Sequence, residues 1–520
     1  MDVTVGSLLD RGTREHAAVR FRVFSDTRPY DGTVGEVAER ARRLAGGLAR
    51  RGLGPGDVVA YQYPNWAEAA VAFWATSLLG VTIVPVVHIY GPKELRYILE
   101  HTRARAFLTP DRFGRTDYCE VLPSLMDELT DLELVAVDGD DVPAGAVAIS
   151  DLLDADPVEA PESVDPDAAA VVGFTSGTTA EPKGVVHTHR TLTAEMLQLP
   201  RLQPAADSPP LLTASPVSHI TGMISLWAPV MGGREINLLD RWDAATVLDL
   251  VTRHGLSAGG GATFFLTSIL DAPGFGDEHL AWIRSVSLGG APVPAAIAER
   301  ADALGISLVR AYGSTEHPST TGGSHADDPR DKRLYTEGRP MPWVELRVVD
   351  AAGNEVGPGE TGEIHSRGPD LFIGYTDPAL TDDAIDGDGW YATGDVGFLD
   401  DGGYLTITDR LKDVIIRGGE NISAVEVEEL VQELPAVAEV AVVAAPDPRM
   451  GERACAFVRP QAGASVDLEA VRAHLRARGL ARQKWPEELQ LVADFERTAS
   501  GKIKKFVLRE RLRQHPSPRG

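Results

Sequence analysis

The apolar pattern between residues 58 and 87 constrains the fold of this chain more than any other feature. A short apolar run from Val58 to Tyr63 precedes a stretch of helical length, from about Trp66 to Leu79, and a β-branched run follows from Val81 to Val87. Two strands joined by a crossover helix lie parallel in one sheet. The same alternation continues along most of the chain, with loops marked by Pro and Gly, and predicts a large layered α/β body.

A helix is expected just before this unit. Thr33 and Glu36 have the spacing of a capping box, and the run Gly52-Leu-Gly-Pro-Gly56 ends the helical pattern. The apolar residues between these limits recur at steps of three and four: Val34, Val37, Ala41, Leu44 and Leu48.

The pattern changes near residue 410. We expect a helix over about 424–434, strands over about 437–444 and 455–458, and a helix over about 468–475. A chain of 520 residues also exceeds what one hydrophobic core usually supports. The sequence therefore predicts two domains: a large α/β body, 1–411, and a small mobile α+β domain, 412–520.

The formal net charge of -26 argues against nucleic acid or an anionic lipid surface as a partner. The chain has two cysteines and no CxxC pair, so a disulfide framework and a cysteine zinc site are not expected. The first residues lack the pattern of a secretion signal, and Glu68, Ser77, Thr82 and Pro85 interrupt the longest apolar stretch. We expect a cytoplasmic protein without a membrane span, in which a bound nucleotide needs local positive charge.

The segment Phe174-Thr-Ser-Gly-Thr-Thr-Ala-Glu-Pro-Lys-Gly184 combines hydroxyls, glycines and one lysine. Glycines let backbone N–H groups approach phosphate oxygens, hydroxyls donate further bonds, and Lys183 adds a point charge. Composition alone would favour an ordinary Ser/Thr-rich loop, and it is the specific order of residues that favours a phosphate site.

That order closely resembles the phosphate-binding signature of the adenylate-forming superfamily, which includes acyl-CoA synthetases, luciferases and the adenylation domains of peptide synthetases. Four further segments match that family's signatures in the right order: Ala311-Tyr-Gly-Ser-Thr-Glu316, Tyr391-Ala-Thr-Gly-Asp395, Asp409-Arg-Leu-Lys-Asp413 with Gly418-Gly-Glu-Asn421, and Arg497-Thr-Ala-Ser-Gly-Lys502. The resemblance implies an acid–CoA ligase that converts a carboxylic acid, ATP and coenzyme A to acyl-CoA, AMP and pyrophosphate through an acyl-adenylate.

The resemblance also implies a role for each matched residue. Thr315 would bind the α-phosphate, Glu316 would hold Mg²⁺, and Lys502 would bridge the substrate carboxylate and the α-phosphate. Tyr312 would stack on adenine, Asp395 would accept both ribose hydroxyls, and Arg410 would reach ribose or phosphate. The other implied nucleotide-binding residues are Thr175, Ser176, Gly177, Thr178, Thr179, Lys183, Gly290, Ala291, Pro292 and Gly313. Taken singly, Tyr312 could be ordinary core and the charged residues solvated surface groups.

In the family the small domain rotates between the two half-reactions, and Lys412 matches the hinge position. Gly418 and Gly419 would then line the path of the coenzyme A pantetheine. The implied acyl pocket contains His219, Phe264 and Gly289, although His219 is equally compatible with a structural role. The run Gly259-Gly-Gly261 and the pair His317-Pro318 suggest a roomy cavity for a bulky or cyclic acid.

Departures from the family pattern leave alternatives open. Ala180 and Trp343 occupy common glycine positions, Glu496 replaces a usual proline, and Ala424 stands where proline is common. Ala180 and Glu496 motivate an enzyme that performs only thioesterification of a pre-formed acyl-adenylate in a natural-product pathway. A stand-alone enzyme that loads a carrier protein and a degenerate nucleotide-binding protein are further alternatives, and a homodimer is left open.

Overall fold

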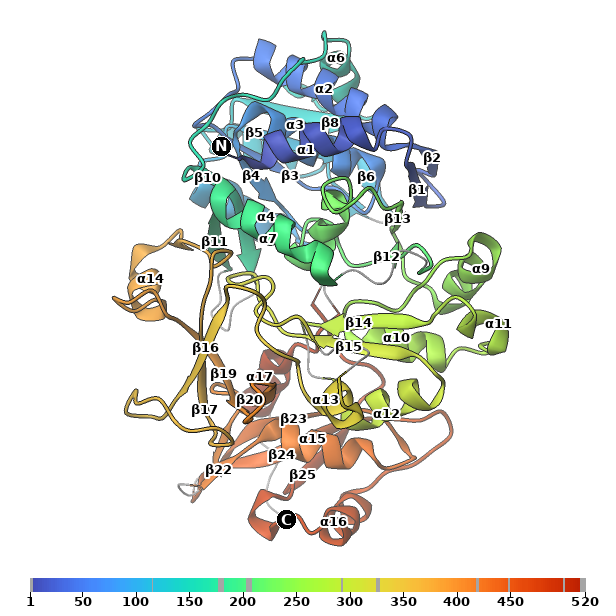
Figure 1. The fold of residues 1–520 in the computed structure, drawn as a ribbon, viewed down its shortest axis with the longest axis vertical. Coiled ribbons are helices and arrows are strands. Elements are labelled where there is room, and N and C mark those ends of the chain that lie inside the picture. Colours follow the sequence, from blue (N-terminus) through green and yellow to red (C-terminus); the bar gives the residue numbers. More distant parts are fainter. Residues whose placement is uncertain are drawn as a thin grey trace.

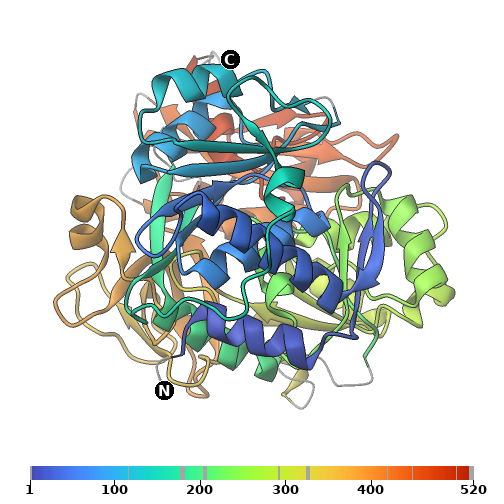
Figure 2. The same ribbon diagram turned by 90° about the horizontal axis from the view of Figure 1, so that it is seen from above.

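The computed structural model describes residues 3–514 except 115, 176–181, 203–207, 291–292, 324–327, 418–419, 448 and 499–500. In Figure 1 the N-terminal elements lie at the top and the C-terminal elements at the bottom, with the middle of the chain between them. Seen from above in Figure 2, the orange segment and the green segment lie on opposite sides of the molecule.

The helix predicted before residue 52 is confirmed as α2 (Val34–Arg50). Thr33 caps it, accepting a hydrogen bond from the Glu36 N–H, while the Glu36 side chain accepts one from the Thr33 N–H. α2 packs on α3 (Ala67–Leu79), which is buried along nearly its whole length and ends at Gly80 in the left-handed conformation (φ 63°). A helix that is apolar on all sides belongs in a core, and α3 lies inside the largest hydrophobic cluster.

The predicted parallel pairing is confirmed in an eight-stranded sheet of order β18-β11-β10-β4-β3-β5-β8-β9. Its strands from β10 to β9 in that order are parallel, whereas β11 and β18 run antiparallel to their neighbours. The bounds are β3 (Val58–Tyr61), β4 (Thr82–Pro85), β5 (Ala106–Pro110), β8 (Leu134–Asp138), β9 (Val147–Ala148), β10 (Ala169–Thr175), β11 (Lys183–Thr188) and β18 (Gly374–Tyr375).

A second, four-stranded sheet has the order β12-β13-β1-β2, and a separate parallel pair joins β14 to β15. The pair ends with Gly289 opposite Ala311, so the segments that follow both strands begin side by side. Ligands of parallel sheets bind beyond the carboxyl ends of the strands. The bounds are β1 (Arg20–Phe24), β2 (Tyr30–Thr33), β12 (Leu212–Thr213), β13 (Ile236–Leu239), β14 (Ser285–Gly289) and β15 (Ser307–Ala311).

The α/β alternation that was expected for most of the chain ends at β15. Four strands within residues 345–410 form an antiparallel sheet of order β16-β17-β19-β20. In β17 the buried residues Ile364 and Ser366 alternate with half-buried ones, as in a sheet with only one face in the core. The bounds are β16 (Glu345–Val349), β17 (Gly362–Arg367), β19 (Tyr391–Leu399) and β20 (Leu405–Arg410).

The C-terminal α+β unit is built on a sheet of order β22-β21-β24-β23, with β25 parallel to β24. Residues of β23 and β24 alternate between two hydrophobic clusters, one shared with α15 and α16 and the other with α17. The bounds are β21 (Ile415–Arg417), β22 (Glu420–Ile422), α15 (Ala424–Gln432), β23 (Val437–Asp447), β24 (Gly451–Pro460), α16 (Leu468–Ala477), β25 (Glu488–Leu491) and α17 (Lys505–Gln514). A boundary between residues 411 and 412 stays a prediction.

The other elements are short. They are α1 (Val5–Glu15), α4 (Pro92–Thr102), β6 (Arg112–Phe113), β7 (Thr116–Asp117), α5 (Leu122–Glu128), α6 (Ile149–Leu153), α7 (His189–Gln198), α8 (Ile220–Met223), α9 (Ala244–His254), α10 (Thr263–Leu270), α11 (Asp277–Leu280), α12 (Ala295–Ala303), α13 (Arg330–Tyr335) and α14 (Pro378–Ala384). Across the described ranges, no helix has both the length and the apolar character needed to cross a lipid bilayer.

Trp343 has a left-handed backbone conformation (φ 68°), and its side chain is 70% exposed. Glycine adopts this conformation without the steric conflict of a Cβ atom, whereas a bulky residue there is an outlier. The fold therefore keeps, at Trp343, the backbone that glycine would take.

Candidate active site

One continuous cleft of about 2610 Å³ runs between the body and the C-terminal unit. It is lined by every predicted site residue that the structure describes: Thr175, Lys183, His219, Phe264, Gly289, Gly290, Tyr312, Gly313, Thr315, Glu316, Asp395, Arg410, Lys412 and Lys502. Ser176, Gly177, Thr178, Thr179, Ala291, Pro292, Gly418 and Gly419, together with the substituted Ala180, lie outside the described residues. Side chains separated by more than 300 positions in the sequence thus face one space.

Tyr312, Asp395 and Arg410 form a bonded group at one end of this cleft. The Tyr312 hydroxyl donates a hydrogen bond of 2.7 Å to Asp395, and Arg410 Nε lies 2.6 Å from the other carboxylate oxygen. Asp395 and Arg410 are opposite each other on β19 and β20, which explains how residues of two signatures meet. Burial and the neighbouring Asp395 raise the pKa of Tyr312, and Asp395 raises the pKa of Arg410. All three groups were predicted to face the nucleoside, and the Asp395 carboxylate is bonded by both of the others.

Gly313 is required by the backbone that follows Tyr312. A Cβ atom at this position would lie 1.9 Å from the carbonyl oxygen of Pro318, so no side chain fits. The chain doubles back here, with the Ser314 N–H donating to the His317 carbonyl. This fold places Thr315 and Glu316 directly beyond Tyr312 in the cleft.

Thr315 is positioned by two strands of the eight-stranded sheet. Its carbonyl accepts a hydrogen bond of 2.8 Å from Nε2 of His187 on β11, and its methyl group lies against Gly173 of β10. Burial lowers the pKa of His187 to about 4, so this imidazole is neutral at ordinary pH. Sequence reasoning missed His187, because a lone histidine in a strand gives no indication of which backbone it will support.

Glu316 lies beside the strands that carry the phosphate loop. Its carboxylate accepts a hydrogen bond of 2.9 Å from the hydroxyl of Tyr375, which is on β18 next to β11. The Lys183 ammonium lies 5.0 Å from the centre of the Tyr375 ring, and Lys183 is opposite Thr175 in the sheet. Tyr375 is a second residue that sequence reasoning missed.

Within the described ranges, no group of three or more His, Cys, Asp or Glu side chains could by itself hold a metal ion. Glu316 therefore offers one carboxylate rather than a protein cage. Mg²⁺ bound with substrate phosphates commonly uses one or two carboxylates and keeps water ligands, so this donor set is compatible with that ion.

Lys502 enters the cleft from a short hairpin of the C-terminal unit. Arg497 and Ile503 pair as an antiparallel bridge, the Thr498 N–H donates to the Lys502 carbonyl (2.7 Å), and the Lys502 N–H donates to Thr498 Oγ1 (3.1 Å). The side chain passes so close to Gly290 that a Cβ atom there would contact Lys502 Cε at 3.4 Å.

Burial, with the nearby Arg410 charge, lowers the pKa of Lys502 to about 8. The ammonium group of Lys502 therefore begins to lose its proton at mildly alkaline pH. It lies between the predicted nucleoside end of the cleft, at Tyr312 and Asp395, and the predicted acyl end, at His219.

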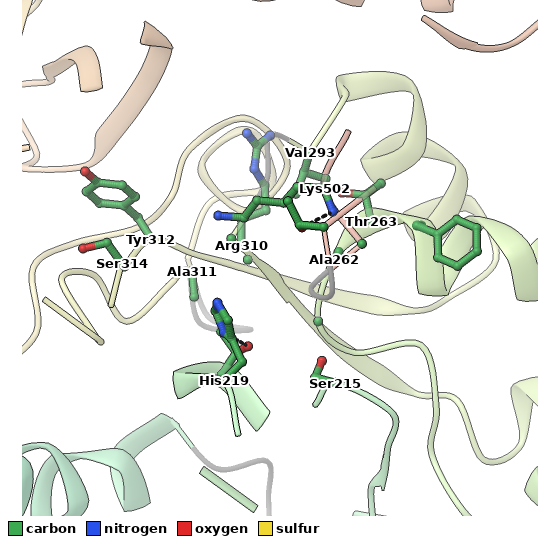
Figure 3. Close-up of a pocket in the computed structure, with 18 of the residues that line it drawn as sticks. Ser215, His219, Ala262, Thr263, Val293, Arg310, Ala311, Tyr312, Ser314 and Lys502 are labelled. Carbon is green, nitrogen blue, oxygen red and sulfur yellow. Dashed lines mark hydrogen bonds between the residues drawn. The ribbon is translucent and has the colours of Figure 1, made fainter. Parts of the chain in front are cut away.

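Figure 3 shows the second end of the cleft, where His219 and Ser215 face Lys502 and Ala262 across the pocket. His219 is half-buried and hydrogen-bonds to the Thr221 hydroxyl at 3.0 Å. Burial, with the nearby Lys502 charge, lowers the pKa of His219 to about 4, so its ring is neutral. This end therefore presents small and neutral groups.

The expectation that His317 widens the acyl cavity is wrong. Its side chain is 1% exposed and bonds to Ser366 (2.8 Å) and Asp370 (3.3 Å), away from the cleft. A histidine with two buried polar partners is held inward by them, because an unpaired buried polar group is costly. Pro318, Gly260 and Gly261 do line the cleft, as expected.

Glu195 completes the buried group around His317 and was not found from the sequence. This carboxyl, fully buried on α7, accepts hydrogen bonds of 2.6 Å from Ser319 and from Gln198. Burial and the adjacent Asp370 raise the pKa of Glu195. The Ser319 contact anchors the segment that follows Glu316 to α7.

The sequence and structure comparisons agree with this geometry. Residues 10–376 match the AMP-binding enzyme family, and residues 426–502 match the AMP-binding enzyme C-terminal domain. The chain belongs to the AMP-binding enzymes. This AMP-binding enzyme is 35% identical over 484 residues to the medium-chain fatty-acid–CoA ligase of Escherichia coli, covering 92% of this chain and 85% of that one. It is 34% identical over 523 residues to a salicylyl-CoA synthase / salicylate adenylyltransferase of Streptomyces, covering 98% and 94%.

Solved structures of AMP-binding enzymes have the same fold. ATP-bound MatB from Rhodopseudomonas palustris superposes with a TM-score of 0.86 at 28% identity, covering 98% of this chain and 99% of that one. The o-succinylbenzoate CoA synthetase of Bacillus subtilis, in complex with its acyl-adenylate intermediate, gives 0.80 at 26% identity, covering 99% of each chain. The protein is an ATP-dependent, AMP-forming acid–CoA ligase of the adenylate-forming superfamily, as its sequence predicted.

Proposed function

We propose that this ligase activates a bulky, ring-bearing monocarboxylic acid and that Lys502 promotes the adenylation step. The observation that carries the proposal is the position of Lys502, which lies over Gly290 between the Tyr312–Asp395–Arg410 group and the pocket of His219. A cation there meets negative charge as the carboxylate oxygen attacks the α-phosphorus and pyrophosphate leaves.

The nucleotide would lie along the wall that ends at β15. Tyr312 supplies a ring for adenine, Asp395 has acceptor oxygens for ribose hydroxyls, and Thr315 donates to the α-phosphate. Arg410 already bonds to Asp395, which keeps this carboxylate in place. Glu316 is the residue that we assign to Mg²⁺, whose charge would offset that of the phosphates.

The nature of the acyl pocket and of the relatives supports an acid with a ring. Small residues, Ala262 and Gly261 among them, line it, and His219 is neutral. Arg310, which also lines the cleft, donates to Leu334 O and to Glu337, so its charge is already balanced and does not call for a second carboxylate on the acid. Relatives named for salicylyl-CoA, feruloyl-CoA and indoleacetate are 31–34% identical to this chain over at least 92% of its length.

The second half-reaction would follow after the C-terminal unit rotates. Lys412 is exposed and joins β20 to β21, in a segment where a few backbone angles can change, so we assign it the hinge. We also assign Gly418 and Gly419 to the coenzyme A path, as the resemblance implies. A homodimer and a cytoplasmic location also stay predictions.

Exchange of labelled pyrophosphate into ATP tests the proposal, with octanoate, benzoate, salicylate, ferulate, indoleacetate and malonate as the acids. We expect exchange with ring-bearing acids and acyl-CoA formation when coenzyme A is added. Exchange with straight-chain acids alone would contradict the acid class. No exchange with any acid, but thioester formation from synthetic salicyl-AMP or octanoyl-AMP, would favour the thioesterification-only alternative. A phosphopantetheinyl carrier preferred over coenzyme A would favour the carrier-loading alternative.

A further inference from the structure

A cation–π pair joins the C-terminal unit to the predicted acyl-binding part of the body. The Arg497 guanidinium lies over the ring of Phe264, 4.9 Å from its centre. Phe264 is in the first turn of α10 and lines the cleft, whereas Arg497 begins the hairpin that carries Lys502. The contact therefore joins the two structural units five residues from the lysine.

Other contacts of the same hairpin reinforce this joint. Gly501 (φ 87°) packs so closely that a Cβ atom there would lie 3.2 Å from the Ala262 Cβ and 4.0 Å from the Phe264 Cβ. Gly501 precedes Lys502, and its carbonyl accepts a hydrogen bond of 3.3 Å from Arg497. The direction of the lysine side chain is thus coupled to the surface formed by residues 262–264.

An ion pair within the C-terminal unit fixes the position of the Arg497 side chain. Its Nη2 lies 2.6 Å from Glu439 on β23, and the second oxygen of Glu439 bonds at 2.7 Å to Arg459 on β24. These partners move with Arg497, whereas Phe264 belongs to the body. Rotation of the C-terminal unit would keep the Glu439 pair and separate Arg497 from the ring.

Resting on the assignment of Lys502 above, we propose that Arg497 is a positioning residue for adenylation alone, acting by stacking on Phe264. The contact stabilises the arrangement in which Lys502 reaches the reaction centre. Because Phe264 also lines the acyl pocket, the acid that packs against this ring contributes to the same joint. Arg497 has no part in thioesterification, during which the pair is apart.

Measurement of the two half-reactions separately tests this role in the full-length enzyme. The probes are pyrophosphate–ATP exchange with the best acid of the panel, and thioester formation from coenzyme A and the matching synthetic acyl-AMP. We expect Arg497→Gln and Phe264→Leu each to lower the exchange kcat by about 2- to 30-fold, the range of exposed to desolvated cation–π pairs. Thioester formation by Arg497→Gln should change by less than about twofold, because this contact is absent from that step.

Three further variants guard against a general structural effect. Arg459→Gln removes the other arginine on Glu439 without touching Phe264, and it should leave the exchange kcat within about twofold of wild type. Phe264→Tyr keeps an aromatic face and should restore exchange relative to Phe264→Leu. The double variant Arg497→Gln/Phe264→Leu should lose no more exchange activity than the worse single variant, because both remove one contact.

Equal loss of both half-reactions in Arg497→Gln would overturn the proposal, as would additive losses in the double variant or wild-type exchange rates in both single variants. Thermal melting of each variant identifies a loss due to misfolding, and in that case the Phe264→Tyr comparison decides. A wild-type enzyme without exchange would instead contradict the assignment of the adenylation step itself, so the two failures are distinguishable.

Discussion

The two ends of the cleft are built differently. At the predicted nucleoside end, Tyr312 and Arg410 both bond to Asp395, at 2.7 and 2.6 Å, and Tyr312 and Asp395 are buried. At the acyl end, His219 bonds to its neighbour Thr221, and small residues face the space. A nucleotide that all family members share can be bound by a fixed set of polar side chains. An acid that differs between members is selected by the shape of its pocket. Specificity for the acid should therefore vary without loss of nucleotide binding.

Removal of the cation between the two ends should have the largest effect. We expect Lys502→Ala to lower acid-dependent pyrophosphate exchange by about 10²- to 10³-fold, because the charge that develops at the α-phosphate loses its partner. Thioester formation from supplied acyl-AMP should persist, which a stopped assay with synthetic acyl-AMP would measure. Equal loss of both activities would contradict a role of Lys502 in adenylation alone.

Disruption of the nucleoside end comes next. Asp395→Ala should lower kcat/KM for ATP by about 10- to 100-fold, since it removes a charged acceptor and leaves Arg410 and Tyr312 unpaired. The KM for the acid should stay within about threefold, because the acyl end is untouched. Tyr312→Phe is the matched control: it keeps the ring and loses only the bond to Asp395, so its effect should be smaller. A larger effect on the acid than on ATP would contradict the division of the cleft.

The pH profile should report the charge of Lys502. Burial lowers its pKa to about 8, and the role proposed for Lys502 in adenylation needs the protonated form, so kcat/KM for exchange should fall above pH 8. Full dependence on one proton gives about a tenfold loss per pH unit. Lys502→Arg, whatever its absolute rate, should remove this decline, because guanidinium stays charged throughout that range. A decline that persists in the arginine variant would assign it to another group.

The smallest effect is expected at the acyl end. His219→Ala should enlarge the pocket and change the ratio of kcat/KM for benzoate and ferulate by about 3- to 10-fold, in favour of the larger acid. The KM for ATP should not change, which the same assays would establish. A shift in ATP affinity without a shift in acid preference would place His219 with the nucleoside end.

The sequence predicted much of the site because phosphate binding and charge stabilisation tolerate few residue types. Tyr312, Thr315, Glu316, Asp395 and Lys502 all face the cleft as expected. The supporting residues were not predicted: His187 and Glu195 act through buried hydrogen bonds whose partners are about 125 positions away.

The sequence by itself determined the family, the α/β start of the chain, the helix α2 with its Thr33 cap, and the small α+β unit that follows β20. These are local patterns, in which the period of apolar residues and the order of short signatures carry the information. Only the tertiary structure decided that residues 345–410 form an antiparallel sheet, that His317 points away from the pocket, and that Arg497 lies over Phe264. Each of these depends on which residue far away in the sequence offers a hydrogen bond or a packing surface. The local spacing of residues does not show which distant residues will be in contact.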